Sequence, residues 1–407
     1  MSQLQAAASS SGGPPNTPTL EGELEGKLLL HDDNVPPPAA PPQTKQGERC
    51  QPREGGADIA GDHRERFLRA YERLRDELLD DDSCELTDEA RRWVAQMIDY
   101  NVPGGKLNRG LSVIDSYLLL KQGSEVAEDE FFLACVLGWC VEWFQACALL
   151  LDDIMDDSHT RRDQICWYRR PEVGLHGIND GILLKCHITR FIKNYFREKP
   201  YYIDICELWN EVSLLRIKTP IEIGKFRNNT TLQTSLGQML DLISTHNGTN
   251  DVAKYNIEVY RRIVKYKTSY YSFYLPVACA LLLYGAKLEN FSGLRDDDYL
   301  DCFADPNKIG KIGTDIEDHK CSWLIVQALG HANSDEIEVL LENYGKKDST
   351  SVSKVKNTYS TLDLKEIFSE FEDRAYKHLV TSIEAQNDRA VQEILKFFLK
   401  KIHRRKK

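Results

Sequence analysis

The longest apolar stretch of this chain, residues 131–151 (FFLACVLGWCVEWFQACALLL), sets the strongest limit on its fold. About 20 consecutive apolar residues are enough for a helix to cross a membrane. Glu142 and Gln145 lie inside this stretch, however, and acidic residues follow it directly. A helix that is apolar nearly all round but carries a few polar groups is typical of the centre of a large bundle. We therefore predict a central bundle helix here and no membrane span.

The rest of the chain after residue 62 shows helical patterns. Thr87 is placed to cap a helix, and Pro103-Gly104-Gly105 is placed to end it. Runs in which apolar and polar residues alternate, the usual strand signal, are nearly absent. These features predict one all-α domain over residues 63–407, long enough to bury a full core.

The first 62 residues have a different composition. They contain nine of the 15 prolines and eight of the 25 glycines, and they lack Phe, Tyr and Trp. Such a segment buries too little apolar surface to offset its chain entropy, so we expect a disordered tail over residues 1–62. Arg49 is its first arginine and glutamates come early, unlike a mitochondrial presequence. We therefore expect a cytoplasmic protein.

The overall charge and the cysteines exclude two further classes. The chain has 52 Lys and Arg against 63 Asp and Glu, a formal charge of −11, which argues against general nucleic-acid binding. Its 11 cysteines show no C-x-x-C pair and no Cys/His metal spacing. Several lie inside apolar runs, which favours reduced, buried thiols over a disulfide framework.

An acidic cluster follows the apolar helix directly. Asp152, Asp153 and Asp156 lie in LLLDDIMDD, and the first and third share a helix face because they are four residues apart. Like charges at this spacing cost a helix about 0.2–0.5 kcal/mol per pair, so a cation is expected to compensate them. Hard oxygen ligands without Cys or His suit Mg²⁺. An exposed acidic helix end is the simpler alternative for one such cluster.

A second cluster with the same spacing, Asp297, Asp298 and Asp301, lies in DDYLD. Two such faces opposed across a bundle would hold several Mg²⁺ ions and, through them, a diphosphate. Basic residues that suit phosphate contacts accompany the two clusters: Lys106, Arg109, Arg161, Arg162, Lys267 and Lys311.

Five segments together resemble the motif series of eukaryotic farnesyl diphosphate synthases. They are GGKLNRG, LLLDDIMDDSHTRRDQICWY, LGQMLDL, YKTSYYSFYLP and DDYLDCFADPNKIGKIGTDIEDHKCSW, in the family's order. The resemblance runs from about residue 63 to the C-terminus. It implies an isoprenoid-synthase-type helical bundle with a central apolar cavity, homodimeric and dependent on Mg²⁺. It also implies a prenyltransferase that joins isopentenyl diphosphate head to tail onto dimethylallyl and then geranyl diphosphate, giving farnesyl diphosphate.

The resemblance also implies roles for individual residues. The six aspartates would hold about three Mg²⁺ ions on the allylic diphosphate, which Arg161, Lys267 and Lys311 would contact directly. The isopentenyl diphosphate site would consist of Lys106, Arg109, Gln145, Arg162 and Arg404. The allylic cation would face Thr268, Gln238 and the Lys267 carbonyl, and Asp241 would support the same wall.

Cys147 and Ala148 depart from the family pattern. Members that stop at fifteen carbons usually carry bulky aromatic residues at these positions, whose side chains limit the pocket for the growing tail. A further five-carbon unit buried in a deeper pocket would gain about 3–4 kcal/mol. A geranylgeranyl diphosphate synthase is therefore an alternative, unless Trp143, Phe144 or a residue of another helix fills the gap.

Two length changes also depart from the family. The segment between Pro276 and Asp297 is about a dozen residues short, and residues 214–226 (LLRIKTPIEIGKF) resemble an insertion. An inactive splice or gene-model variant is one alternative that follows. A terpene cyclase is another, which the isopentenyl diphosphate residues argue against because a cyclase has no second substrate.

Overall fold

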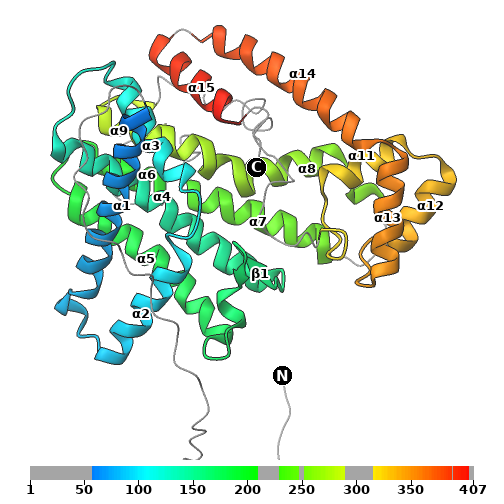
Figure 1. Cartoon of the computed structure of the whole chain (residues 1–407), viewed down its shortest axis with the longest axis horizontal. Helices are drawn as coiled ribbons and strands as arrows, with labels where there is room; N and C mark the ends of the chain where they lie inside the picture. Colours follow the sequence, from blue (N-terminus) through cyan, green and yellow to red (C-terminus); the bar gives the residue numbers. More distant parts are fainter. Residues whose placement is uncertain (1–56, 210–228, 247–251, 289–314, 387, 403–407) are drawn as a thin grey trace, which may run out of the picture. The chain divides into compact units, whose positions relative to one another are not determined.

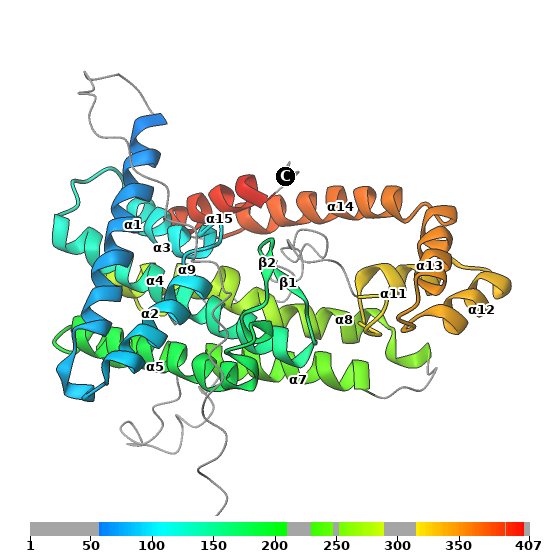
Figure 2. The same ribbon diagram turned by 60° about the horizontal axis from the view of Figure 1, so that its bottom comes forward.

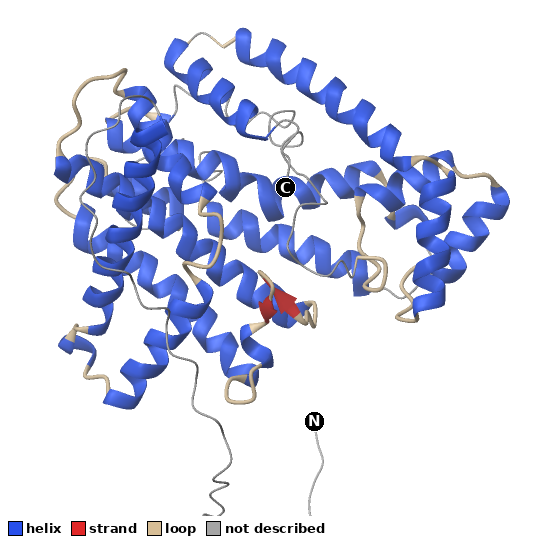
Figure 3. Ribbon diagram, viewed as in Figure 1, coloured by secondary structure: helices blue, strands red, loops and turns tan. Residues whose placement is uncertain are grey.

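The computed structural model describes residues 57–209, 229–246, 252–288, 315–386 and 388–402. Apart from one two-stranded hairpin, the elements of these residues are helices (Figures 1 and 3). The helices are α1 (Ala57–Leu79), α2 (Asp88–Asn101), α3 (Asn108–Leu120), α4 (Glu128–Met155), α5 (Gly177–Phe196), α6 (Tyr202–Trp209), α7 (Thr230–His246), α8 (Ile257–Ile263), the π-helix η6 (Val264–Tyr274), α9 (Leu275–Tyr284), α11 (Trp323–His331), α12 (Ser334–Asn343), α13 (Ser349–Thr361), α14 (Leu364–Glu384) and α15 (Arg389–Ile402). Short 3₁₀ turns are η1 (Asp82–Cys84), η2 (Trp167–Arg169), η3 (Gly174–His176) and η5 (Val252–Lys254).

Helix α4 is the centre of the bundle, as predicted. It packs against α1, α3, α5 and α9, and its tryptophans Trp139 and Trp143 are completely buried. The helix is long and apolar enough to cross a membrane, but 83% of its most apolar window is buried inside the protein. Its apolarity is therefore explained by its place in the core.

Two hydrophobic clusters form the core. The larger surrounds α4, and the smaller is built from α8 and from α11 to α14. In both ribbon views α7 and α8 extend from the α4 region toward α11 and α13 (Figures 1 and 2). The site described below lies on the part of α7 and η6 that meets the end of α4.

Local sequence signals explain the bounds of α2. The Thr87 side chain accepts a hydrogen bond from the Ala90 amide, which confirms the predicted cap. The helix ends at Asn101, two residues before Pro103, because proline cannot continue the backbone hydrogen bonds.

The expected boundary at residue 62 is too late. Helix α1 begins at Ala57, and its buried residues Phe67 and Leu74 pack in the larger cluster. The charged first turns of α1 carry no aromatic residue, so composition alone placed them in the tail. Residues 1–56 of the tail, the segment 214–226 and residues 289–296 of the shortened segment before Asp297 lie outside the described residues.

Candidate active site

The end of α4 directs its three aspartates to two sides. Asp152 and Asp156 share one face, since the Asp156 amide donates to the Asp152 carbonyl at 2.8 Å in the last helical turn. Asp153 is buried and lies against Arg161, whose guanidinium also reaches Asp152 Oδ2 at 3.3 Å. The face with Asp152 and Asp156 is the one that meets α7 and η6.

Lys267 connects α4 to α7. Its Nζ lies 3.0 Å from Asp152 Oδ1 and 2.6 Å from Asp241 Oδ2. Gln238, one turn before Asp241 on α7, donates to Asp152 Oδ1 at 3.1 Å. The structure therefore brings these four predicted site residues into one hydrogen-bonded group.

Lys320 completes this group, although no spacing in the sequence singles it out. Its Nζ lies 2.8 Å from Asp156 Oδ1 and 2.7 Å from Asp241 Oδ2. The residue follows a described turn before α11 and reaches the site from the side of the smaller core cluster. Its segment DIEDHKCSW belongs to the quoted motif series, which was the signal available in the sequence.

The charges of this group stabilise one another. Burial alone would raise the pKa of Asp241, but the ammonium groups of Lys267 and Lys320 hold it below its ordinary value. Burial would likewise lower the pKa of Lys267, but the carboxylates of Asp152 and Asp241 raise it well above its ordinary value. Asp241 and Lys267 are therefore both charged near neutral pH.

Gly237 allows the close approach of α7 and η6 that this group requires. A Cβ atom at Gly237 would lie 2.1 Å from the Lys267 backbone nitrogen, far inside contact distance. The backbones of the two helices therefore touch at this point. As a result Gln238 and Asp241 lie beside the side chain of Lys267, with half-buried Thr268 next along η6.

A two-residue turn directs Arg161 and Arg162 apart. Strands β1 (Thr160–Arg161) and β2 (Gln164–Ile165) form a short antiparallel hairpin, and Arg162 and Asp163 at its tip have φ values of 54° and 62°. Two positive φ values are the signature of a type I′ turn. Arg161 donates to Asp153 at 2.5 Å, whereas Arg162 donates to the Asn101 carbonyl at 3.0 Å.

Arg162 and Arg109 form a second basic group. Arg162 passes beside Gly105, where a Cβ atom would lie 3.0 Å from its guanidinium. Arg109, in the first turn of α3, donates to the Ser272 hydroxyl at 2.9 Å and lies over the Tyr271 ring. Both arginines therefore belong to the wall between the α2–α3 connection and η6.

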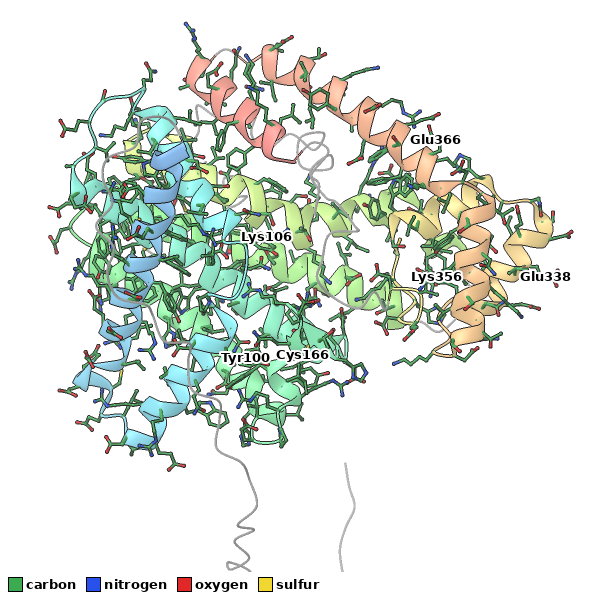
Figure 4. The ribbon with its side chains drawn as sticks, in the orientation of Figure 1. Tyr100, Lys106, Cys166, Glu338, Lys356 and Glu366 are labelled. Atoms are coloured by element: carbon green, nitrogen blue, oxygen red, sulfur yellow. The ribbon has the colours of Figure 1, made fainter. Side chains whose placement is uncertain are left out.

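Gln145 and Lys106 differ in exposure. Gln145 is buried on α4, and within the described part of the chain its Oε1 has no hydrogen-bond partner. Lys106 is exposed in the connection before α3 (Figure 4). Its backbone carbonyl accepts a hydrogen bond from Arg64, which fixes the connection to α1.

A pocket lies behind the hairpin. Its polar side is formed by Asn101, Gly104, Asp153, Arg161 and Arg162, and its apolar side includes Ala146, Leu149, Leu150 and Trp167. Tyr100 also lines this pocket, and Cys166 is labelled beside Tyr100 in the view of Figure 4. Glu338 and Lys356 lie far from it, on α12 and α13.

Of the remaining predicted site residues, the structure describes only Cys147 and Ala148. Cys147 is buried, and Ala148 is half-buried on the α4 face that carries Asp152. Asp297, Asp298, Asp301, Lys311 and Arg404 lie outside the described residues. Among the residues that are described, no three His, Cys, Asp or Glu side chains are arranged as a metal site.

The sequence matches one family closely. The polyprenyl synthetase family model matches residues 91–362. A farnesyl pyrophosphate synthase of Zea mays is 54% identical over 87% of this chain and 99% of its own length. One named as mitochondrial in Arabidopsis thaliana is 53% identical over 84% of this chain and 87% of its own length.

Solved structures give the same result for the fold. The T. brucei farnesyl diphosphate synthase complexed with risedronate has a TM-score of 0.72 to this chain at 30% identity. The match covers 85% of this chain and all of the T. brucei chain. The complex of that synthase with the bisphosphonate BPH-722 has a TM-score of 0.73 at 31% identity.

Proposed function

This chain belongs to the polyprenyl synthetase family, among its farnesyl diphosphate synthases, and we propose that it makes farnesyl diphosphate by head-to-tail prenyl transfer. Its substrates would be isopentenyl diphosphate and the allylic dimethylallyl and geranyl diphosphates. The observation that carries the proposal is the shared group of Asp152, Asp156 and Asp241 with Lys267 and Lys320. In the presence of substrate, these carboxylates could bind metal ions, and the ammonium groups could bind the diphosphate.

The donor set of this group fits Mg²⁺. Asp152 and Asp156 offer only carboxylate oxygens on one face of α4, and neither Cys nor His takes part. Lys267 and Lys320 neutralise these oxygens in the present structure. On binding of a diphosphate the ammonium groups would turn to its oxygens and leave the carboxylates to about three Mg²⁺ ions, with Asp153, Asp297, Asp298 and Asp301 as further ligands. Bound Mg²⁺ supplies charge stabilisation for the leaving diphosphate.

The side chains of this chain supply the remaining chemistry. Lys267, Lys320 and Arg161 would hold the allylic diphosphate and stabilise its charge as the C–O bond breaks, with Lys311 as a further contact. The double bond of isopentenyl diphosphate then attacks the allylic carbon, and the released diphosphate takes the proton that the resulting carbocation loses to form the new double bond. Gln238, Thr268 and the Lys267 carbonyl would present oxygen dipoles to the cation, so that a protein nucleophile is not required.

The second basic group would bind isopentenyl diphosphate. Arg109 and Arg162 are guanidinium groups in one wall, and such groups bind phosphate oxygens in pairs. The buried amide of Gln145 is available to a ligand, because in the described structure its Oε1 has no partner. Exposed Lys106 and the C-terminal Arg404 would close over this diphosphate.

The aromatic residues below Ala148 favour a fifteen-carbon product. Phe144 lies one turn below Ala148 on the same face of α4, and its ring meets those of Trp209 and Tyr271 edge to face, with centroids 5.8 and 5.6 Å apart. We infer that these rings close the pocket that small Cys147 and Ala148 would otherwise leave open. They support farnesyl diphosphate over the twenty-carbon product.

We also propose a homodimer. Leu232, Leu236, Met239 and Ile243 form a stripe along α7 at helical spacing, and each is between 42% and 53% exposed. Ile178 and Ile182 add exposed apolar surface on α5. Apolar stripes of this kind mark protein interfaces, and a second copy of the chain is the occupant that the family supports. Met239→Glu is expected to give a monomer in light-scattering measurements, whereas wild type gives a dimer.

The cellular location is proposed to be the cytoplasm. All nine described cysteines are free thiols, which suits a reducing compartment. One relative is named as mitochondrial, so fractionation of cells that express the tagged full chain is the direct test. Recovery in a mitochondrial fraction contradicts this placement.

The central experiment is product analysis. The purified chain with Mg²⁺, labelled isopentenyl diphosphate and geranyl diphosphate is expected to give a fifteen-carbon diphosphate, and a chelator is expected to stop the reaction. Turnover of farnesyl diphosphate alone to a hydrocarbon indicates a cyclase instead. No turnover of either mixture indicates that the length changes around residues 214–226 and before Asp297 have inactivated the chain.

A further inference from the structure

Glu142 is a carboxylate buried in the middle of the central helix. Only 3% of the residue is exposed, and its Oε1 accepts a hydrogen bond from the Gly110 amide at 2.8 Å. A buried carboxylate costs several kcal/mol unless opposite charges and hydrogen bonds compensate it. The role of this charge is not explained by the packing of α4, because Val141 and Trp143 on either side of it are apolar.

Two glycines bring Glu142 to the start of α3. A Cβ atom at Gly138 would lie 2.6 Å from the Gly110 carbonyl oxygen, and one at Gly110 would lie 2.8 Å from the Gly138 carbonyl oxygen. The backbones of α3 and α4 therefore touch at this crossing. Gly110 directly follows Arg109, so the crossing fixes the backbone of Arg109 next to the Glu142 carboxylate.

The guanidinium groups of Arg109 and Arg162 both act on Glu142. Burial raises the pKa of Glu142, and these two positive charges oppose that effect. Burial also lowers the pKa of Arg162; Glu142 opposes this, while Arg161 and Arg109 reinforce it. Three arginines therefore crowd one region. Asp153 pairs with Arg161 at 2.5 Å, which leaves Glu142 as the main countercharge for Arg162.

We propose that Glu142 is a positioning residue for isopentenyl diphosphate: its negative charge holds the guanidinium groups of Arg109 and Arg162 side by side, ready to bind one diphosphate. This inference rests on the proposed function. The Nε of Arg109 also donates a 2.9 Å hydrogen bond to the Ser272 hydroxyl, which helps to fix this guanidinium. Without the charge of Glu142 the two guanidinium groups repel each other and separate before the ligand arrives.

The variant Glu142→Gln tests the charge alone. The amide keeps an oxygen acceptor for the Gly110 amide, so a purely structural role predicts kinetics like those of wild type. We expect the KM for isopentenyl diphosphate to rise about tenfold, and the KM for geranyl diphosphate to change less than twofold. Glu130→Gln is the matched control, because Glu130 lies in the first turn of α4 and pairs with Lys121 at 2.8 Å.

A double-mutant cycle with Arg162→Gln distinguishes a role of Glu142 in positioning Arg162 from a non-specific structural effect of the substitution. If Glu142 acts through the arginines, Glu142→Gln raises the KM for isopentenyl diphosphate at least threefold less in the Arg162→Gln background than in wild type. An unchanged KM, or an equal rise for both substrates, overturns the inference. If Glu142→Gln does not fold, the double variant is expected to fold because it removes both charges, and its failure to fold also overturns the inference.

Calorimetry distinguishes failure of this inference from failure of the proposed function. A wild-type chain that makes no product can still bind isopentenyl diphosphate, and the expected tenfold loss of affinity in Glu142→Gln is then measured directly. Equal binding by wild type and variant contradicts the role of Glu142. A wild-type chain that does not bind isopentenyl diphosphate contradicts it too.

Discussion

Lys267 and Lys320 donate to the same oxygen, Asp241 Oδ2, at 2.6 and 2.7 Å, although they come from different parts of the chain. Each also donates to an aspartate of α4, Asp152 or Asp156. The two ammonium groups therefore join α4, α7 and the segment before α11 through charge. Binding of a diphosphate would have to rearrange all of these contacts together.

The pH dependence of stability follows from Asp241 and Lys267. The folded-state pKa of Asp241 is below its ordinary 3.8, so its contribution is present above pH 3.8 and is lost as pH falls through the folded value. The folded-state pKa of Lys267 is above its ordinary 10.5. The stability that Lys267 contributes is therefore present below pH 10.5 and is lost as pH rises through the folded-state pKa. Urea unfolding across pH should show loss of stability at both extremes, with a smaller acid loss in Asp241→Asn. Equal acid losses contradict this assignment.

Removal of Lys320 should weaken the fold and the allylic site together. Lys320→Met leaves Asp156 and Asp241 with one ammonium group fewer, and breaking such a buried pair costs about 3 kcal/mol. We expect a rise of at least tenfold in the KM for geranyl diphosphate, measured by steady-state kinetics. Lys356→Met on α13, an exposed lysine far from the site, is the control and should match wild type. A Lys320→Met enzyme with unchanged KM removes Lys320 from the site.

Gly237→Ala should separate α7 from η6. The added Cβ would meet the Lys267 backbone at 2.1 Å, so one helix must shift, at a cost of about 3 kcal/mol or more. Gly330→Ala in α11 is the matched control, since a Cβ there meets nothing within 4 Å. The control should be neutral or more stable by up to about 1 kcal/mol. Denaturant unfolding compares the two, and equal stabilities contradict the close approach.

Phe144→Ala should lengthen the product. Phe144 lies about one helical turn, 5.4 Å, below Ala148, and removing its ring frees space at that depth for a further five-carbon unit. The additional buried unit gains about 3–4 kcal/mol. Phe132→Ala, nearer the start of α4, serves as a control and should leave the product unchanged. Chain-length analysis that gives only fifteen carbons for Phe144→Ala shows that another residue closes the pocket.

The sequence predicted the features that depend on local rules. The central helix, the Thr87 cap and the shared face of Asp152 and Asp156 follow from periodicity and helix geometry. Lys320 and Glu142 act through residues distant in the chain, and no local spacing marks them. The two-residue strands of the hairpin are too short for any alternation to be visible.

The hairpin tip also has a consequence for how the two substrates are aligned. Arg161 and Arg162 are neighbours in sequence, yet the left-handed backbone at Arg162 points one guanidinium to each proposed diphosphate site. One peptide unit joins the two residues, so their backbones move together, while the hydrogen bonds to Asp153 and to the Asn101 carbonyl fix the position of each guanidinium. A shift of the hairpin would therefore move both arginines together, which would help to keep the two substrates aligned.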